Sequence, residues 1–184
     1  RTIGGTTAGL FASLFFAISP IIIMRGSIGW FKSEPLGLFY GLLAVYLLLS
    51  AIKSDKGKVS LAKIVGAGIF LAFGLASWGG SQFFILPIGF FFLALPFLRK
   101  DNKFVIWTSV IFTFVFILVT VLFELMKAVG LPVETGGFTF ISSLNGFFLI
   151  GCTAFLVACI GIRKMFNKSQ LRISLALLGG SIIS

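Results

Sequence analysis

The stretch Phe104–Met126, which reads FVIWTSVIFTFVFILVTVLFELM, is apolar along almost its whole length and has one charged residue, Glu124, near its end. A helix that crosses the hydrocarbon core of a bilayer needs about 20 consecutive, mostly apolar residues. This run meets that requirement. We therefore expect a membrane-spanning helix here, and the same criterion can be applied to the rest of the chain.

Similar apolar runs occur on both sides of this stretch. We predict about seven spans in all, which we place at residues 4–24, 36–52, 59–78, 83–98, 104–126, 142–162 and 171–184. Pro87 and Pro96 lie within the fourth, so we expect that span to be tilted, kinked or partly re-entrant. The sequence therefore predicts an all-α polytopic membrane protein.

The composition supports lipid as the main solvent of this chain. Hydrophobic residues make up 58% of it and charged residues only 11%, whereas a soluble domain has roughly 25% charged residues. Histidine is absent, which removes the commonest acid–base and metal-ligating side chain. The net charge of +10 would suggest nucleic acid in a soluble protein. Here we expect no nucleic acid, because the basic residues lie at the ends of the apolar runs.

These basic residues alternate between the predicted loops. The second, fourth and sixth loops hold most of them: Lys53, Lys56, Lys58, Lys63, Arg99, Lys100, Lys103, Arg163, Lys164, Lys168 and Arg172. The odd loops hold only Arg25, Lys32 and Lys127. Because basic loops stay in the cytoplasm, we expect loops 25–35, 79–82 and 127–141 to be non-cytoplasmic. The membrane would be a prokaryotic cell membrane, or the endoplasmic reticulum in a eukaryote.

The first of these outer loops brings three charged groups to the membrane surface. It reads RGSIGWFKSEP from Arg25 to Pro35. Arg25 and Lys32 offer sites for phosphate or carboxylate, and the Glu34 carboxylate suits a hard cation. Taken alone, these residues also fit a purely structural loop, and that interpretation is the more common one for such a pattern.

The third predicted loop, Trp78-Gly79-Gly80-Ser81-Gln82, carries no charge. Two glycines after a tryptophan permit a tight turn and close approach of another group to the backbone. This signal alone is weak.

Together the two loops resemble the catalytic subunit of the oligosaccharyltransferase, the enzyme of protein N-glycosylation. In that family, an outer loop has a proline five residues before an arginine, then Gly, Phe and Glu at fixed offsets. The matching residues here are Pro20, Arg25, Gly29, Phe31 and Glu34. Two spans later the family has Ala-Trp-Gly-Gly, then aromatic residues and a proline. The matching residues here are Ala76, Trp78, Gly79, Gly80, Phe83, Phe84 and Pro87.

This resemblance implies the thirteen-span membrane glycosyltransferase fold, known as the GT-C type, with a soluble carboxy-terminal domain. The chain begins at Arg1 and ends within an apolar run. We therefore expect it to be an internal section of a longer protein, inactive by itself, with the soluble domain outside it.

The resemblance also implies a reaction. The donor is a glycan on a polyprenyl phosphate or pyrophosphate, and the acceptor is a polypeptide with Asn in Asn-x-Ser/Thr on the non-cytoplasmic side. A divalent cation, Mg²⁺ or Mn²⁺, stabilises the leaving phosphate. By the same resemblance, Glu34 is a metal ligand and catalytic carboxylate. Arg25 orients it or contacts the donor phosphate, and Trp78, Gly79 and Gly80 line the substrate site.

Two positions depart from the family pattern. Lys32 stands where the family has an Asp ligand, and a protonated lysine cannot bind a metal ion, so we expect a cation site that is altered, supplied mainly by segments outside this chain, or lost. Ser81 replaces an aromatic residue after Trp-Gly-Gly. Lys32 keeps open a second hypothesis, another glycosyltransferase that uses a polyprenyl-linked sugar. A transporter is a third, although transporters usually place charges inside their spans, and here only Glu124 lies at the edge of one.

Overall fold

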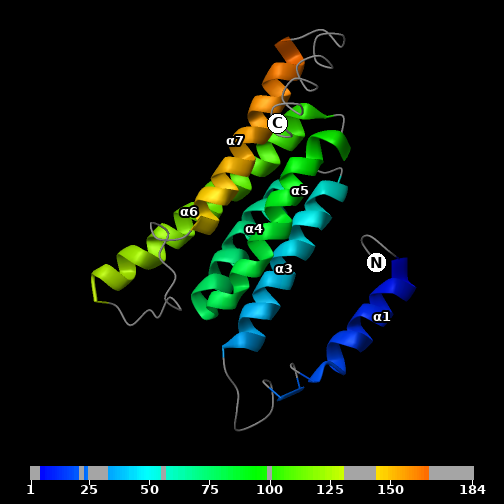
Figure 1. Ribbon diagram of the computed structural model, residues 1–184, viewed down its shortest axis with the longest axis vertical. Coiled ribbons are helices and arrows are strands. Elements are labelled where there is room, and N and C mark those ends of the chain that lie inside the picture. The colour runs from blue at the N-terminus through cyan, green and yellow to red at the C-terminus, as the bar shows by residue number, and fades with distance from the viewer. Residues whose placement is uncertain are drawn as a thin grey trace, which may run out of the picture.

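The computed structural model describes residues 5–20, 23–24, 33–54, 57–98, 101–130 and 144–165, and every regular element among them is helical. In chain order these elements are α1 (Gly5–Ala17), α3 (Glu34–Lys53), α4 (Gly57–Ser77), the 3₁₀ helix η1 (Gly79–Phe84), α5 (Ile85–Leu98), α6 (Asn102–Ala128) and α7 (Leu144–Met165). The all-α prediction is therefore confirmed for the described part of the chain (Figure 1).

Four helical stretches among these residues are long and apolar enough to cross a membrane. They are Glu34–Lys53, Gly57–Ser77, Gly79–Phe97 and Asn102–Ala128, and the apolar helices Gly5–Ala17 and Gly146–Ile162 are shorter. The total of about seven spans, and the thirteen-span fold to which they would belong, stay predictions. The last predicted run, 171–184, lies outside the described residues.

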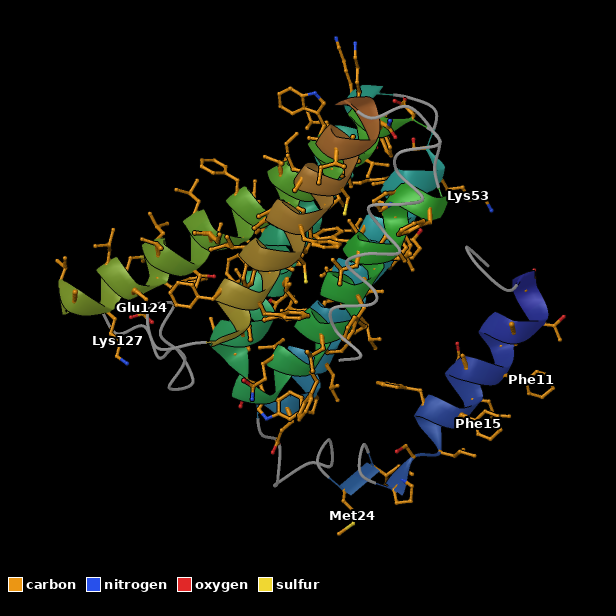
Figure 2. All side chains as sticks on the ribbon, turned by 45° about the horizontal axis from the view of Figure 1, so that its top comes forward. Phe11, Phe15, Met24, Lys53, Glu124 and Lys127 are labelled. Carbon is orange, nitrogen blue, oxygen red and sulfur yellow. The ribbon has the colours of Figure 1, made fainter. Side chains whose placement is uncertain are left out.

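The helices α3 to α7 pack into one bundle, in which α3 and α4 form an antiparallel hairpin. α4 also packs against α6, and α5 against α7. Helix α1 stands apart from this bundle in Figure 1 and has no buried residue. Its side chains Phe11 and Phe15 project into open space (Figure 2), as lipid-facing side chains do.

Helix α1 is shorter than the predicted span 4–24. It ends at Ala17, where the Ile18 N–H still bonds to the Leu14 carbonyl at 3.0 Å. The α conformation is disfavoured for the residue before a proline, and Pro20 follows three residues after the end of α1. The described residues 18–20 and 23–24 continue the chain beyond this break.

Glycines mark the places where the helices approach most closely. A Cβ added at Gly68 of α4 would lie 3.1 Å from the carbonyl oxygen of Phe112 and 3.2 Å from the backbone nitrogen of Phe116, both on α6. In lipid, helices associate through close van der Waals packing, which small residues permit. Gly68 therefore fixes the point at which α4 and α6 cross.

Helices α6 and α7 are also joined by a polar contact. The hydroxyls of Thr113 and Thr153 lie 2.8 Å apart, and both side chains are buried. Near them the buried rings of Phe92 on α5 and Phe112 on α6 meet edge to face, with centroids 5.4 Å apart. The core at this level is thus aromatic, with a hydrogen bond between two helices inside it.

The fourth predicted span, 83–98, starts earlier in the structure than the sequence indicated. Helical geometry begins at Gly79 as the 3₁₀ helix η1 and continues directly into α5. The segment 79–82, which we predicted to be a loop, is therefore a helical turn. Pro96 lies inside α5, whereas Pro87 lies near the junction of η1 and α5.

Candidate functional site

Glu34 is the first residue of α3. Ser33 precedes it as the N-cap residue without a side-chain cap bond, and Pro35 occupies the next helical position. A carboxylate at a helix N-terminus is stabilised by the helix dipole, typically by about 0.3–1 kcal/mol. The side chain is half-buried and its Oε2 atom is shielded from solvent.

The Trp78 segment joins α4 to η1. Trp78 itself is extended, with φ −152° and ψ 121°, and the Ser81 N–H donates to its carbonyl at 2.9 Å. A Cβ at Gly80 would collide with the Trp78 indole ring. Among the described residues, only Gly5 and Gly130 have positive φ. Glycine is therefore required at position 80 because the indole lies over the backbone there, and not because the turn needs a left-handed conformation.

Packing between α3 and η1 brings these two features to the same end of the bundle. A Cβ added at Gly37 of α3 would lie 2.6 Å from Cβ of Trp78 and 2.7 Å from Oγ of Ser81. Residues three and seven positions apart share one helix face, so Glu34 lies on the face of α3 that also carries Gly37 and Gly41. Glu34 is thus one helical turn from the contact with Trp78.

Two of the predicted site residues, Arg25 and Lys32, lie outside the described residues. Glu34, Trp78, Gly79 and Gly80 lie within them and fall at one end of the helix bundle. The contact between the elements that carry the two predicted motifs is made by Gly37 on one side and by Trp78 and Ser81 on the other.

Basic residues gather at the opposite end of the bundle. The last residue of α3, Lys53, lies there (Figure 2), as do Lys58 near the start of α4 and Lys103 near the start of α6. Two hydrogen bonds tie the hairpin together at this end: Ser60 Oγ donates to the Ala51 carbonyl at 2.9 Å, and Lys63 Nζ to Ser50 Oγ at 2.8 Å. The bundle therefore has one basic end and one end that carries Glu34 and Trp78.

Among the described carboxylates, Glu34 is the one that lies a helical turn from the contact with Trp78, whereas Glu124 lies near the end of α6, close to Lys127 (Figure 2). The described residues contain no group of three or more His, Cys, Asp or Glu side chains close enough to hold a metal ion. Asp101 is at the other end of the bundle, where its Oδ1 accepts from the Phe104 N–H at 3.3 Å. Glu34 fits Mg²⁺ or Mn²⁺ as a hard oxygen donor, and further ligands would have to come from outside the described residues.

Three residues of this region were not selected from the sequence: Gly37, Gly41 and Ser81. A signal for the two glycines exists, because they are four residues apart in an apolar run, and this spacing is typical of close helix contacts in membranes. Ser81 had no such signal beyond its departure from the family pattern.

These observations establish the general class of protein to which the chain belongs. Apolar helices of spanning length, with a carboxylate and a Trp-Gly-Gly segment together at one end, make this chain an integral membrane protein with a candidate site at the end of its bundle. The family model "Oligosaccharyl transferase STT3, N-terminal" matches residues 1–180, so the chain belongs to this oligosaccharyl transferase family.

This match confirms the resemblance that the two motifs indicated, and the family is one of glycosyltransferases. Oligosaccharyl transferases act on a lipid-linked glycan and a protein acceptor. Membership in this family argues against the transporter hypothesis. Comparison with curated proteins and with solved structures gives no match.

Proposed function

We propose that the chain forms the middle membrane section of an enzyme that transfers a glycan from a polyprenyl phosphate or pyrophosphate to Asn in Asn-x-Ser/Thr on the non-cytoplasmic side. Membership in the oligosaccharyl transferase family over residues 1–180 supports the class of reaction. The observation that carries the assignment of the site is the packing of Gly37 against Trp78, which puts Glu34 beside the Trp-Gly-Gly segment.

Each residue of the site has a distinct task in this proposal. The half-buried Glu34 carboxylate presents oxygen ligands to the cation or orients the acceptor amide, and partial burial strengthens its field. Arg25 contacts the donor phosphate through its guanidinium, which binds phosphate oxygens in a bidentate manner. Trp78, with Gly79 and Gly80, forms a wall of the substrate site. A bound Mg²⁺ or Mn²⁺ would supply Lewis-acid stabilisation of the leaving phosphate.

Substitution of Glu34 tests this site directly. Glu34→Gln keeps the size of the side chain and removes its charge, so we expect glycosylation of an Asn-x-Thr peptide by the full-length protein to fall at least about tenfold. Asp101→Asn is the matched control, because it removes a carboxylate at the opposite end of the bundle. A glycosylation rate that is unchanged in Glu34→Gln would exclude Glu34 from the site.

Lys32 provides a second test in the opposite direction. If it occupies the position of a metal ligand, Lys32→Asp replaces a repelling ammonium by an oxygen donor. We expect a higher glycosylation rate or a lower Mn²⁺ concentration for half-maximal rate. If neither quantity changes, Lys32 does not lie at the cation.

The second candidate function keeps the polyprenyl-linked donor and changes the acceptor to a lipid or a hydroxyl. Lys32 favours it, since the altered position suggests a changed cation site. Peptides that differ only in Asn-x-Thr or Gln-x-Thr separate the two functions in the full-length protein. Transfer to the Asn peptide alone supports N-glycosylation, whereas transfer to neither peptide, with consumption of the lipid-linked donor, supports the second candidate.

A further inference from the structure

Three elements meet at two glycines of α3. A Cβ at Gly41 would run into the ring of Phe84 at the end of η1, and one at Gly37 would meet Trp78 and Ser81. On the α4 side, a Cβ added at Gly74 would lie 3.4 Å from the carbonyl oxygen of Gly37. A side chain at position 37 or 41 would therefore push η1 away from α3.

The glycines and the serine of this contact are buried, whereas Trp78 and Phe84 are half-buried. Gly37, Gly41 and Gly74 are buried, and Ser81 has an exposed fraction of 0%. Among the described residues, the Ser81 hydroxyl has no hydrogen-bond partner. A buried hydroxyl without a partner is unfavourable, so polar bonding does not explain how η1 is held here. Shape complementarity explains it instead, because Gly37 and Gly41 leave room for the side chains of Trp78, Ser81 and Phe84.

We propose that Gly37 and Gly41 are positioning residues for the glycosyl transfer. The two glycines leave a slot on the surface of α3, and the side chains of Trp78, Ser81 and Phe84 are seated in it. The seated η1 fixes the Trp-Gly-Gly segment relative to Glu34, which lies on the same helix face one turn away. This inference rests on the proposed function, because it assumes that Glu34 and Trp78 act on the same substrate.

Alanine substitutions in the slot test the inference. Gly37→Ala and Gly41→Ala displace η1 without touching Glu34, and a displacement of about 1 Å at a reacting centre costs up to about a hundredfold in rate. We expect kcat for an Asn-x-Thr peptide to fall at least about tenfold, with a smaller change in KM, since the loss concerns alignment. Full kcat in both variants would overturn the inference.

Two glycines elsewhere in the bundle provide matched controls. A Cβ at Gly66 of α4 makes only an ordinary contact, 3.4 Å from Leu47 Cδ1, and one at Gly151 of α7 meets nothing within 4 Å. Gly66→Ala and Gly151→Ala should both retain the parental kcat. A loss in these variants as large as in Gly37→Ala would mean that any added methyl group impairs the bundle, and the slot would have no special role.

A compensating substitution separates positioning from simple instability. Gly41 is opposed by the ring of Phe84, so Phe84→Ala removes the group with which a new methyl collides. We expect the double variant Gly41→Ala/Phe84→Ala to have a higher kcat than Gly41→Ala alone. A double variant no more active than Gly41→Ala would contradict the seating of Phe84 on Gly41.

A distance measurement tests the seating without any turnover. Phe39 on α3 and Phe83 on η1 are both exposed, so spin labels on Phe39→Cys and Phe83→Cys should report one narrow distance in a background of Cys152→Ala and Cys159→Ala. Gly37→Ala should shift or broaden this distance, and Gly66→Ala should not. An unchanged distance in Gly37→Ala would overturn the inference.

These measurements also distinguish the two proposals. If Glu34→Gln retains full activity while Gly37→Ala shifts the spin-label distance and lowers kcat, the positioning of η1 by the slot is upheld, and the role of Glu34 in the proposed function fails. If Glu34→Gln is impaired and Gly37→Ala is unaffected in kcat and in distance, the proposed function is upheld and the slot fails.

Discussion

Ser81 combines complete burial with a hydroxyl that has no partner among the described residues. Such a group destabilises the fold locally, because the hydroxyl has lost its hydration without gaining a hydrogen bond. Its neighbour across the contact is Gly37, and no larger residue fits at position 37. The size of the side chain at position 81 is therefore set by the backbone of α3.

This geometry predicts opposite effects for two substitutions at Ser81. Ser81→Ala removes the unpartnered hydroxyl, so the free energy of unfolding should be unchanged or higher, by up to about 1–3 kcal/mol. Ser81→Tyr, which restores an aromatic residue at this position, should lower the midpoint of thermal unfolding in detergent, since overpacking typically costs about 1–3 kcal/mol. Equal midpoints for the two variants would show that position 81 is not enclosed.

The two predicted motifs show what a sequence reveals at the scale of single residues. Glu34 and Trp78 were found because each stands in a local pattern of loop residues. Gly37 and Ser81 were not selected, although they make the contact between those motifs. That contact joins positions far apart in the chain, and its evidence is the absence of a Cβ, which no local chemical signal marks.

At the scale of elements, α6 is held to its two neighbours in different ways. Its contact with α4 depends on Gly68, which lets the backbones approach, and its contact with α7 includes the hydrogen bond between Thr113 and Thr153. Lipid competes weakly for a hydrogen bond inside a bundle. Measured side-chain hydrogen bonds between membrane helices nevertheless average only about 0.6 kcal/mol, with a maximum near 1.7.

A double-mutant cycle measures this bond. Thr113→Val and Thr153→Val should each lower the free energy of unfolding by about 0.6–1.7 kcal/mol. The double variant should lose less than the sum, because neither buried hydroxyl is then left without its partner. Thr120→Val is the control, since the Thr120 hydroxyl donates within α6 to the Phe116 carbonyl at 2.8 Å. Strictly additive losses would mean that the 2.8 Å contact does not couple the two helices.

Element boundaries were predictable where hydropathy alone decides them. The helices α3, α4 and α6 overlap apolar runs whose length matches a bilayer. The start of the fourth span was misplaced because two adjacent glycines are typical of a turn. In the structure these glycines belong to a 3₁₀ helix that α3 and α4 hold in place, and such tertiary support overrides local propensity.

At the scale of the whole molecule, the outer surface of the bundle is apolar. Large side chains on several helices are more than half exposed, among them Phe90, Trp107 and Phe114. Soluble proteins rarely expose apolar surface of this extent, so these side chains mark the lipid-facing surface. The spanning helices alternate in direction (Figure 1), and this alternation assigns each helix end to one of two faces.

The two faces lead to a topology prediction. Lys58 and Lys103 lie at the basic end, whereas Ser33, Phe83 and Lys127 lie at the end of Glu34 and Trp78. Single cysteines at these five positions, in a background without Cys152 and Cys159, should react with a membrane-impermeant maleimide in two classes. By the positive-inside rule, Ser33→Cys, Phe83→Cys and Lys127→Cys should react in intact cells.

The other two cysteines, Lys58→Cys and Lys103→Cys, should react only after the membrane is opened. The comparison that matters most is between Ser33→Cys and Phe83→Cys, which flank Glu34 and the Trp-Gly-Gly segment. Both motifs can act on one substrate only if they reach the same aqueous phase, because a bilayer about 30 Å thick separates the two faces. Labelling of these two positions from opposite sides would therefore remove the basis for a shared catalytic site, whatever the activity of the individual variants.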